Sequence, residues 1–290
     1  MQDKNEKKMR NEKDGYKILN NGSISGSMDL KLKDKIILVT GASKGLGYAC
    51  AKVLSEEGAK VIISSRSEEN LKHASEKIGR ETQNQTEWIA ADVSKLDDIT
   101  KMKHTILKRY GTLDGIIINA GGPPPGQSLA MSEDQWKSAL DTNFLSVVRL
   151  TKEFTPIMQD KKYGRIVAIT SISAKEPLPN LVLSNSTRLA VVGFLKTLAN
   201  DVARDNVLVN VVMPGTTNTD RLKQVIEKWA ENGNKSIEQV VKERTAQIPM
   251  RRFGEPEEFG TFVTFLVSGR NTYITGQVIA VDGGFIKSSL

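Results

Sequence analysis

The sequence predicts an α/β fold: a doubly wound sheet of seven mainly parallel strands, with helices on both faces, in a single domain. From residue 35 onward, short runs rich in β-branched residues alternate with longer segments that carry apolar residues at three- and four-residue spacing. This alternation is typical of βαβ units, in which a helix returns the chain to begin the next parallel strand. The chain has 290 residues, 39% of them hydrophobic, enough to bury the large core of such a domain.

The individual elements follow from these two periodicities. Strands are expected at 36–40, 60–65, 86–91, 115–119, 165–170, 207–212 and 277–281. Helices are expected at 46–57, 68–80, 99–109, 133–161, 184–204 and 256–266.

The segment 217–249 departs from this alternation, because it is long, polar and helical and precedes the last helix. An insertion above the carboxyl ends of the strands is a common place for a substrate lid, so we expect one here. Trp229 and the aliphatic residues of this segment are compatible with a medium-sized, partly apolar ligand, or with packing inside the protein.

Residues 1–27 differ in composition from residues 28–290, since charged residues and then a Gly/Ser/Asn-rich run dominate them. Such a segment is predicted to be a disordered N-terminal extension. No apolar run in the chain has the length of a signal peptide core or of a membrane span, so we expect neither export nor membrane insertion.

Charge and cysteine content narrow the function classes further. The net charge of +7 is modest, and basic residues do not alternate with aromatic ones, which argues against nucleic-acid binding. The single cysteine, Cys50, lies in an apolar helical stretch and is expected in the core. A reducing, cytoplasmic setting fits best.

A glycine-rich turn joins the first strand to the first helix, in the run Thr40-Gly41-Ala42-Ser43-Lys44-Gly45-Leu46-Gly47. Gly41 permits a tight turn, Gly45 lets the backbone approach a pyrophosphate, and Gly47 allows close packing of helix on strand. The helix N-terminus adds free N–H groups and the positive end of its dipole. The placement of this motif predicts a Rossmann-type dinucleotide site.

The end of the second strand indicates which dinucleotide binds. An acidic residue at this place would bind the ribose 2′-hydroxyl of NAD, but here Ser64-Ser65-Arg66 occupies it. Arg66 and Lys44 can pair with a 2′-phosphate, so NADP(H) is the expected cofactor. The alternative for Arg66 is a solvated surface side chain.

With these residues in view, the sequence from about Leu30 to the C-terminus resembles the short-chain dehydrogenase/reductase family, especially members similar to 3-oxoacyl-carrier-protein reductases. The further matching motifs are Asp92-Val93, Asn119-Ala120-Gly121, Asn143, Pro214-Gly215, Ile274-Thr275-Gly276-Gln277 and Val281-Asp282-Gly283-Gly284. The resemblance implies that Asp92 contacts adenine, that Asn143 organises an active-site water, and that Pro214-Gly215 lies beside the nicotinamide. As alternatives, Asp92 could cap a helix and Asn143 could be satisfied in the core.

The cofactor site expected from the motifs and the resemblance together is the following set. It contains Gly41, Ser43, Lys44, Gly45, Leu46, Gly47, Ser65, Arg66, Asp92, Val93, Asn119, Ala120, Gly121, Arg188, Pro214 and Gly215. No metal is expected.

The segment after the fourth strand departs from the family pattern. Ile118 replaces the first asparagine of the usual Asn-Asn-Ala-Gly, and Gly122-Pro123-Pro124-Pro125-Gly126 follows. Three prolines fix φ and favour a stiff, extended segment. This segment either shapes the mouth of the substrate site or crosses the surface.

The catalytic residues of the family are only partly present. Members reduce carbonyls with a serine after strand five, a tyrosine 13 residues later and a lysine four residues beyond, and here these positions hold Ser171, Ser184 and Arg188. A serine hydroxyl is a much weaker acid than a phenol, so Ser184 is a poor proton donor. Arg188 can hold ribose hydroxyls and stabilise an oxyanion, but it cannot shuttle a proton.

No other tyrosine is placed to substitute. Tyr163 precedes the fifth strand and lies about 25 Å from Ser171 at the rise of a β-strand, and Tyr273 also precedes a strand. The remaining proton sources are Glu176, unless it is a solvated loop charge, and a water chain through Asn143. His73 and His104 are expected at the surface.

These observations favour an NADP(H)-dependent oxidoreductase acting on a carbonyl or alcohol of a small or medium-sized metabolite, with Ser171, Ser184, Arg188 and Asn143 at an atypical active site. The alternatives are a catalytically impaired NADP(H)-binding sensor or scaffold, or a non-redox enzyme on the same fold. The resemblance implies a homodimer or homotetramer built through the helices at 133–161 and 184–204.

Overall fold

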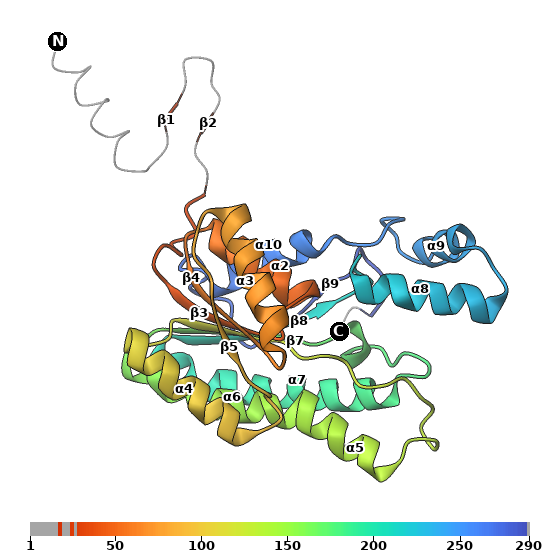
Figure 1. Cartoon of the computed structure of the whole chain (residues 1–290), viewed down its shortest axis with the longest axis horizontal. Coiled ribbons are helices and arrows are strands. Elements are labelled where there is room, and N and C mark those ends of the chain that lie inside the picture. The colour runs from red at the N-terminus through yellow and green to blue at the C-terminus, as the bar shows by residue number, and fades with distance from the viewer. Residues whose placement is uncertain (1–16, 19–23, 26–27, 289–290) are drawn as a thin grey trace. The chain divides into compact units, whose positions relative to one another are not determined.

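The computed structural model describes residues 17–18, 24–25 and 28–288 (Figure 1). The chain divides into two units, Met1–Lys31 and Leu32–Leu290. In the first unit, strands β1 (Lys17–Ile18) and β2 (Ile24–Ser25) pair antiparallel. The disorder expected for residues 1–27 otherwise lies outside the described residues.

The second unit contains a seven-stranded sheet in the order β5-β4-β3-β6-β7-β8-β9, and all its strand pairs are parallel. This is the predicted doubly wound, Rossmann-type sheet, and the order reverses between β3 and β6, where such folds bind their ligands. The strands are β3 (Ile36–Thr40), β4 (Lys60–Ser65), β5 (Glu87–Ala90), β6 (Gly115–Ile118), β7 (Gly164–Ile169), β8 (Val207–Pro214) and β9 (Val278–Val281).

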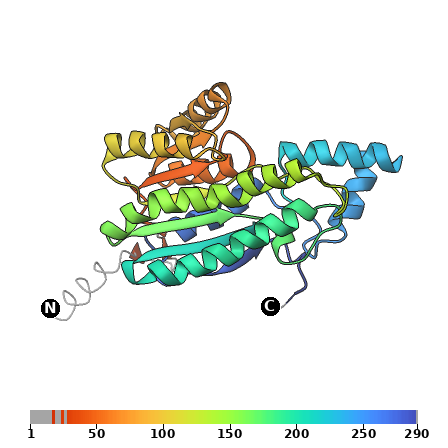
Figure 2. The same cartoon turned by 90° about the horizontal axis from the view of Figure 1, so that it is seen from below.

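Helices cover both faces of the sheet, as predicted (Figures 1 and 2). One layer consists of α2 (Gly45–Glu56), α3 (Glu68–Thr82) and α10 (Pro256–Val267). The other contains α4 (Leu96–Tyr110), α6 (Ser146–Asp160) and α7 (Val182–Val202). α10 packs closely on α2, because a Cβ at Gly260 would lie 3.0 Å from the carbonyl oxygen of Ala49.

The prediction of a single helix at 133–161 is wrong in one respect, because a π-helical turn interrupts that helix. It consists of α5 (Glu133–Ala139), a π-helical turn (Leu140–Leu145) and α6. A π-helical turn adds a residue to one turn without ending the helix, so apolar periodicity does not reveal it. The wider turn contains Asn143, one of the expected site residues.

The central strands form the middle of the core. Every residue of β3, β6 and β7 is buried, whereas the edge strands β5 and β9 are partly exposed. Cys50 lies in the core as expected, and burial raises the pKa of its thiol. Within residues 17–18, 24–25 and 28–288, no helix has the length and apolar character to cross a membrane.

The inserted segment forms a helical hairpin beyond the carboxyl ends of the strands (Figure 2). Its helices are α8 (Asp220–Gly233) and α9 (Ile237–Thr245). Thr217 pairs with Gly254, which holds the two ends of the insertion together. Trp229 packs on the hairpin's own apolar cluster, so it has the packing role rather than an evident ligand contact.

Candidate active site

The glycine-rich turn is held to the neighbouring strand β6 by a reciprocal pair of hydrogen bonds. The Thr40 Oγ1 donates to the carbonyl oxygen of Asn119 and accepts from its N–H, both at 2.9 Å. The Asn119 Nδ2 also donates to the carbonyl oxygen of Gly41 at 2.9 Å. Asn119 therefore fixes the shape of the turn that precedes α2.

The start of α2 is suited to bind a phosphate. Lys44 is its N-cap residue, and its side chain makes no capping hydrogen bond. The first N–H groups of a helix have no partner within the helix, so they are available to an anion. Gly45 has open space around it, since the nearest atom to a Cβ there would be Thr219 Cγ2 at 4.0 Å. The free N–H groups of α2 and the open space at Gly45 fit a pyrophosphate.

The carboxyl end of β4 supplies unused polar atoms beside this turn. Within the described part of the chain, the Oγ atoms of Ser64 and Ser65 are buried and have no hydrogen-bond partner. Lys44 and Arg66 are exposed and form no ion pair with any described residue. The two exposed cations can pair with an anion, and their contact with a 2′-phosphate stays a prediction.

Asp92 shapes the turn before α4 and does not cap that helix, whose N-cap residue is Lys95. Its Oδ1 accepts hydrogen bonds from the N–H (3.0 Å) and Oγ (2.7 Å) of Ser94, in the turn before α4. Burial alone would raise the pKa of Asp92, but these hydrogen bonds and the charge of Arg66 lower it. Val93 packs against the core. Contact between Asp92 and adenine remains a prediction.

The opposite side of the site is formed by the segment after β6 and by the loop after β8. Asn143 donates from Nδ2 to the carbonyl oxygen of Gly121 at 2.9 Å, so the π-helical turn supports this segment. Pro214 ends β8, and a Cβ at Gly215 would lie 2.6 Å from the Cα of Asp282. The motifs expected on the nicotinamide side thus meet at the carboxyl ends of the central strands.

A small cavity lies under this segment. Its lining residues are Ile118, Ala120, Asn143, Val147, Ile169, Thr170, Arg188 and Val191. The space open to the centre of a water-sized molecule is about 10 Å³, room for roughly one water. Asn143 Oδ1, Thr170 Oγ1 and Arg188 Nε are all buried and without a hydrogen-bond partner among the described residues.

Arg188 extends from α7 into this cavity and is partly buried. Its Nη1 donates to the carbonyl oxygen of Ile169, at the end of β7, over 3.3 Å. Burial and the nearby charge of Arg221 lower the pKa of Arg188 to about 10. The side chain therefore stays charged at neutral pH, where it can stabilise an oxyanion but cannot donate a proton readily.

Both expected serines form hydrogen bonds with Ser173, and their contact with a substrate oxygen stays a prediction. Ser171 Oγ accepts from the N–H of Ser173 at 3.1 Å, whereas Ser184 Oγ lies 3.1 Å from Ser173 Oγ. Ser184 is only 8% exposed, so its hydroxyl is engaged inside the protein. The structure brings Ser184 to Ser173, a residue that sequence reasoning missed because the family spacing gives it no role.

The other proposed proton source is also engaged. Glu176 accepts hydrogen bonds at Oε1 from the backbone N–H groups of Lys287 (3.0 Å) and Ser288 (2.9 Å). It therefore fastens the C-terminal segment and is neither a solvated loop charge nor aimed at the cavity. His73 and His104 are exposed, as expected.

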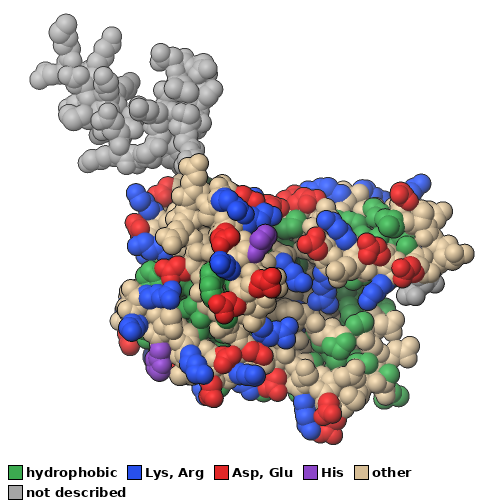
Figure 3. All heavy atoms as spheres, viewed as in Figure 1, with side chains coloured by type: hydrophobic (Ala, Val, Ile, Leu, Met, Phe, Trp, Pro, Cys, Tyr) green, Lys and Arg blue, Asp and Glu red, His purple; other side chains and the backbone are tan. Residues whose placement is uncertain are grey.

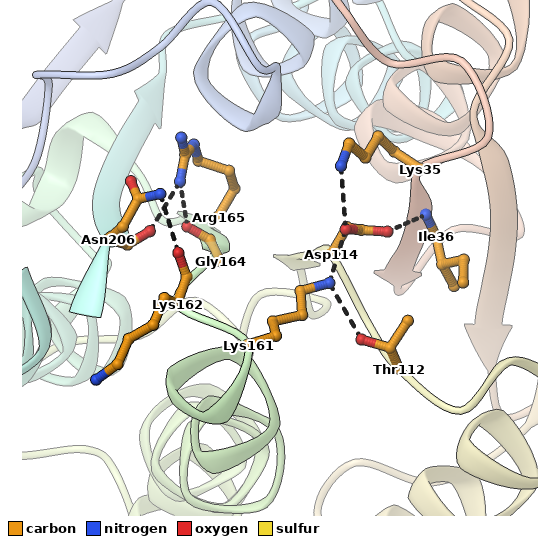
Figure 4. A network of polar contacts seen from close by, with 9 residues as sticks. All are labelled: Lys35, Ile36, Thr112, Asp114, Lys161, Lys162, Gly164, Arg165 and Asn206. Carbon is orange, nitrogen blue, oxygen red and sulfur yellow. Dashed lines mark hydrogen bonds and ion pairs between the residues drawn. The ribbon is translucent and has the colours of Figure 1, made fainter.

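Both alternative tyrosines lie away from the site, as predicted. Tyr273 is 96% exposed. Tyr163 immediately precedes β7, and its ring is contacted by the cations of Lys35 and Arg165, each 4.4 Å from the ring centre. Figure 4 shows the polar network at the amino ends of β3, β6 and β7, opposite the candidate site. Here Asp114 binds Lys161 and the N–H of Ile36.

The proline-containing segment borders the site. The N–H of Gly126 donates to the carbonyl oxygen of Asn180 at 2.7 Å, and Gly126 pairs with Leu181, just before α7. A Cβ at Gly122 would lie 3.1 Å from the Nη1 of Arg221 in α8. The segment thus connects the start of α7 with the inserted hairpin, a position that favours a role at the mouth of the site.

Comparisons with known proteins agree with this geometry. Residues 41–286 match the sequence pattern of the family described as Enoyl-(Acyl carrier protein) reductase. The chain is 33% identical over 257 residues to a 3-oxoacyl-[acyl-carrier-protein] reductase FabG of Chlamydia muridarum, covering 89% of this chain and 99% of that protein. It is likewise 33% identical over 254 residues to human Dehydrogenase/reductase SDR family member 4. That match covers 87% of this chain and 88% of the human protein.

A solved structure shows the same similarity in three dimensions. The L-sorbose reductase from Gluconobacter frateurii, complexed with NADPH and L-sorbose, has a TM-score of 0.86 and 27% sequence identity to this chain. The match covers 90% of this chain and all of that one (100%).

Proposed function

The chain belongs to the short-chain dehydrogenase/reductase family of oxidoreductases, and on that premise we propose that it is an NADP(H)-dependent enzyme that acts on the carbonyl or alcohol of a small or medium-sized metabolite. The observation that carries this proposal is the phosphate-binding turn. Asn119 fixes it against β6, and α2 begins without a side-chain cap, so its N–H groups are available to a pyrophosphate.

The preference for NADP(H) rests on the end of β4. Ser65 and Arg66 stand where an NAD-selective site needs a carboxylate, and Lys44 offers a second cation from the turn. The complex of the L-sorbose reductase relative with NADPH supports the same choice.

The proposed chemistry uses charge in place of the family's tyrosine. When bound, the cofactor supplies or accepts the hydride. Arg188 and Ser171 hold the substrate oxygen, and the fixed charge of Arg188 stabilises the negative charge that develops there. Asn143 and Thr170 direct their free oxygen atoms into the small cavity, where they can hold a water that exchanges the proton. Ser184, hydrogen-bonded to Ser173, is the third residue proposed at this oxygen.

The experiment is to measure NADPH binding by fluorescence and then NADPH oxidation with a panel of carbonyl compounds. With a substrate so identified, Ser171→Ala and Arg188→Ala should each lower kcat by about 100-fold, since each removes a group that stabilises the oxyanion. Ser184→Ala serves as the matched control and should have a smaller effect. Full activity of the Ser171→Ala, Arg188→Ala double variant would remove this site from the mechanism.

The second candidate function is an NADP(H)-binding sensor or scaffold. The observation that favours it is the burial of Ser184 against Ser173, which leaves no acidic hydroxyl at the tyrosine position. Tight NADPH binding without turnover of any carbonyl compound would support this candidate. The Ser184→Tyr, Arg188→Lys variant then tests whether the scaffold regains weak ketone reduction.

The inserted hairpin and self-association complete the proposal. Residues 217–249 act as the substrate lid, since their ends are pinned at Thr217 and Gly254 beside the carboxyl ends of the strands. The chain forms a homodimer or homotetramer through the segments 133–161 and 184–204. The exposed side chains of Leu140 (39%) and Leu189 (56%), one on each segment, support such contacts.

A further inference from the structure

The C-terminal strap, residues 282–288, contains a turn that is closed by its own aspartate. Asp282 accepts hydrogen bonds from the N–H of Gly284 at Oδ1 (2.9 Å) and from the N–H of Ile286 at Oδ2 (2.8 Å). Phe285 and Ile286 pack against the main core. The strap therefore has a defined shape and is anchored to the body of the protein.

The first half of the strap contacts the end of the inserted segment. A Cβ at Gly283 would lie 2.9 Å from Cγ2 of Ile248, and one at Gly284 would lie 3.1 Å from Cγ of Pro249. Both glycines have left-handed backbone conformations, with φ of +65° and +85°. The N–H of Met250 also donates to the carbonyl oxygen of Gly283 at 3.3 Å. The end of the lid thus packs directly on the backbone of the strap.

The second half of the strap binds the loop that follows Ser171. The backbone N–H groups of Lys287 and Ser288 donate to Oε1 of Glu176 at 3.0 Å and 2.9 Å. The N–H of Glu176 donates to the carbonyl oxygen of Ile172 at 3.1 Å, in the helical turn just after Ser171. In Figures 1 and 2 the end of the chain, in dark blue, lies beside the loop that leads into α7. One carboxylate oxygen thus links this loop to the strap.

The same loop sets the place of Ser171 relative to α7. Ser171 Oγ accepts from the N–H of Ser173 at 3.1 Å, and Ser173 Oγ lies 3.1 Å from Ser184 Oγ on the helix. Further along the loop, the N–H of Leu178 donates to Asn185 Oδ1 at 3.3 Å, and Asn185 Nδ2 donates to the carbonyl oxygen of Leu178 at 3.0 Å. A shift of the loop would therefore move Ser171.

We propose that Glu176 is a positioning residue of the candidate active site. It ties the loop of Ser171 to the C-terminal strap, and the strap ties that loop to the end of the lid. This inference rests on the proposed oxidoreductase function. Glu176 acts through the loop: it keeps Ser171 and the lid at the separation that a bound substrate requires.

The test compares Glu176→Ala with Glu176→Gln. Alanine removes the acceptor, whereas the amide oxygen of glutamine can still accept from both N–H groups. Lys175→Ala is the matched control, since it shortens the neighbouring side chain of the same loop and leaves the acceptor in place. Acidic and basic side chains are interspersed over the face seen in Figure 3, so loss of a single charge alters the surface field only slightly.

Hydrogen exchange measures the link without any substrate. In Glu176→Ala the exchange rates of peptides from 172–181 and from 246–250 should both rise by about fivefold or more, because the loop and the lid lose a common anchor. Glu176→Gln and Lys175→Ala should each change these rates by less than about twofold. Unchanged rates in Glu176→Ala, or a rise confined to 172–181, would overturn the proposal.

Kinetics on a carbonyl compound that the NADPH panel identifies separate positioning from folding. Glu176→Ala should raise KM by about tenfold and leave the dissociation constant of NADPH within about twofold, and Glu176→Gln should restore most of KM. A smaller folded fraction lowers the apparent kcat and does not raise KM. A change in kcat alone would therefore overturn the positioning role.

A double-variant cycle identifies the strap as the partner. Removal of residues 287–290 takes away both donors, so it should raise KM as Glu176→Ala does, and the combined variant should show no further rise. Independent effects that multiply would overturn the proposal. Failure of the proposed function has a different signature, because the parent would then bind no NADPH or reduce no compound, and hydrogen exchange would still report on the strap.

Discussion

Gly41 and Gly45 offer a matched pair of substitutions in the phosphate-binding turn. Both have left-handed backbone conformations, with φ of +57° and +63°. An alanine at either position is strained by about 1–2 kcal/mol. Their surroundings differ, because a Cβ at Gly41 would lie 2.6 Å from the carbonyl oxygen of Asn119, whereas a Cβ at Gly45 meets nothing nearer than 4.0 Å.

Gly41→Ala should therefore cost more than Gly45→Ala in free energy of unfolding. The backbone at Asn119 cannot withdraw without breaking its bonds to Thr40, so the overlap adds about 1–3 kcal/mol to the strain. The total is about 2–5 kcal/mol for Gly41→Ala and about 1–2 kcal/mol for Gly45→Ala. Urea unfolding at pH 7 measures both. Equal costs, or a larger cost for Gly45→Ala, would refute the reasoning.

The remaining predictions concern the cofactor, a buried carboxylate and the N-terminal segment. NADPH should bind at least tenfold tighter than NADH, about 1.4 kcal/mol, and Arg66→Asp should narrow or invert the ratio; equal affinities in the parent would contradict the assignment. Burial alone would raise the pKa of Asp114, but Lys161, the N–H of Ile36 and Lys35 lower it. The ionised carboxylate therefore stabilises the fold fully above pH about 4, and this stabilisation is lost as the pH falls through the lowered pKa. Asp114→Asn should therefore reduce the free energy of unfolding by about 1–3 kcal/mol at pH 7 and by less in acid, and a difference that does not depend on pH would count against this account. Deletion of residues 1–27 should leave NADPH affinity and the melting temperature unchanged, and a large fall in either would show that this segment packs on the protein.

Much of the sheet was predictable because its signals are local. The strand limits expected at 36–40 and 60–65 agree with β3 and β4, which contain the apolar runs 36–39 and 61–63. A buried parallel strand needs apolar side chains on both faces, so it is a continuous apolar run in the sequence. β5 is one residue shorter than expected at each end, and β6 is one residue shorter at its carboxyl end.

The sequence predicted the candidate site only where spacing along the chain places the residues. The turn from Gly41 to Gly47 follows directly from residue spacing, and Arg188 was placed by its distance along α7. The expected role of Ser184 at the substrate oxygen stays a prediction, and its partner Ser173 was missed because their contact depends on how the segment after β7 folds back on α7. Glu176 was considered a proton source, and only the position of the C-terminal segment shows that its carboxylate is occupied.

The sequence by itself determined the order of strands and helices, the phosphate-binding turn and the loss of the tyrosine, since each depends on residue type and spacing within one short stretch. The tertiary structure alone decided which side chains share the site. Arg221 meets Gly122, and Asn143 reaches Gly121 from a π-helical turn, because α8, α6 and the segment after β6 converge at the carboxyl ends of the sheet. Such contacts join residues far apart in the chain, and their geometry is set by packing of whole elements that no local pattern records.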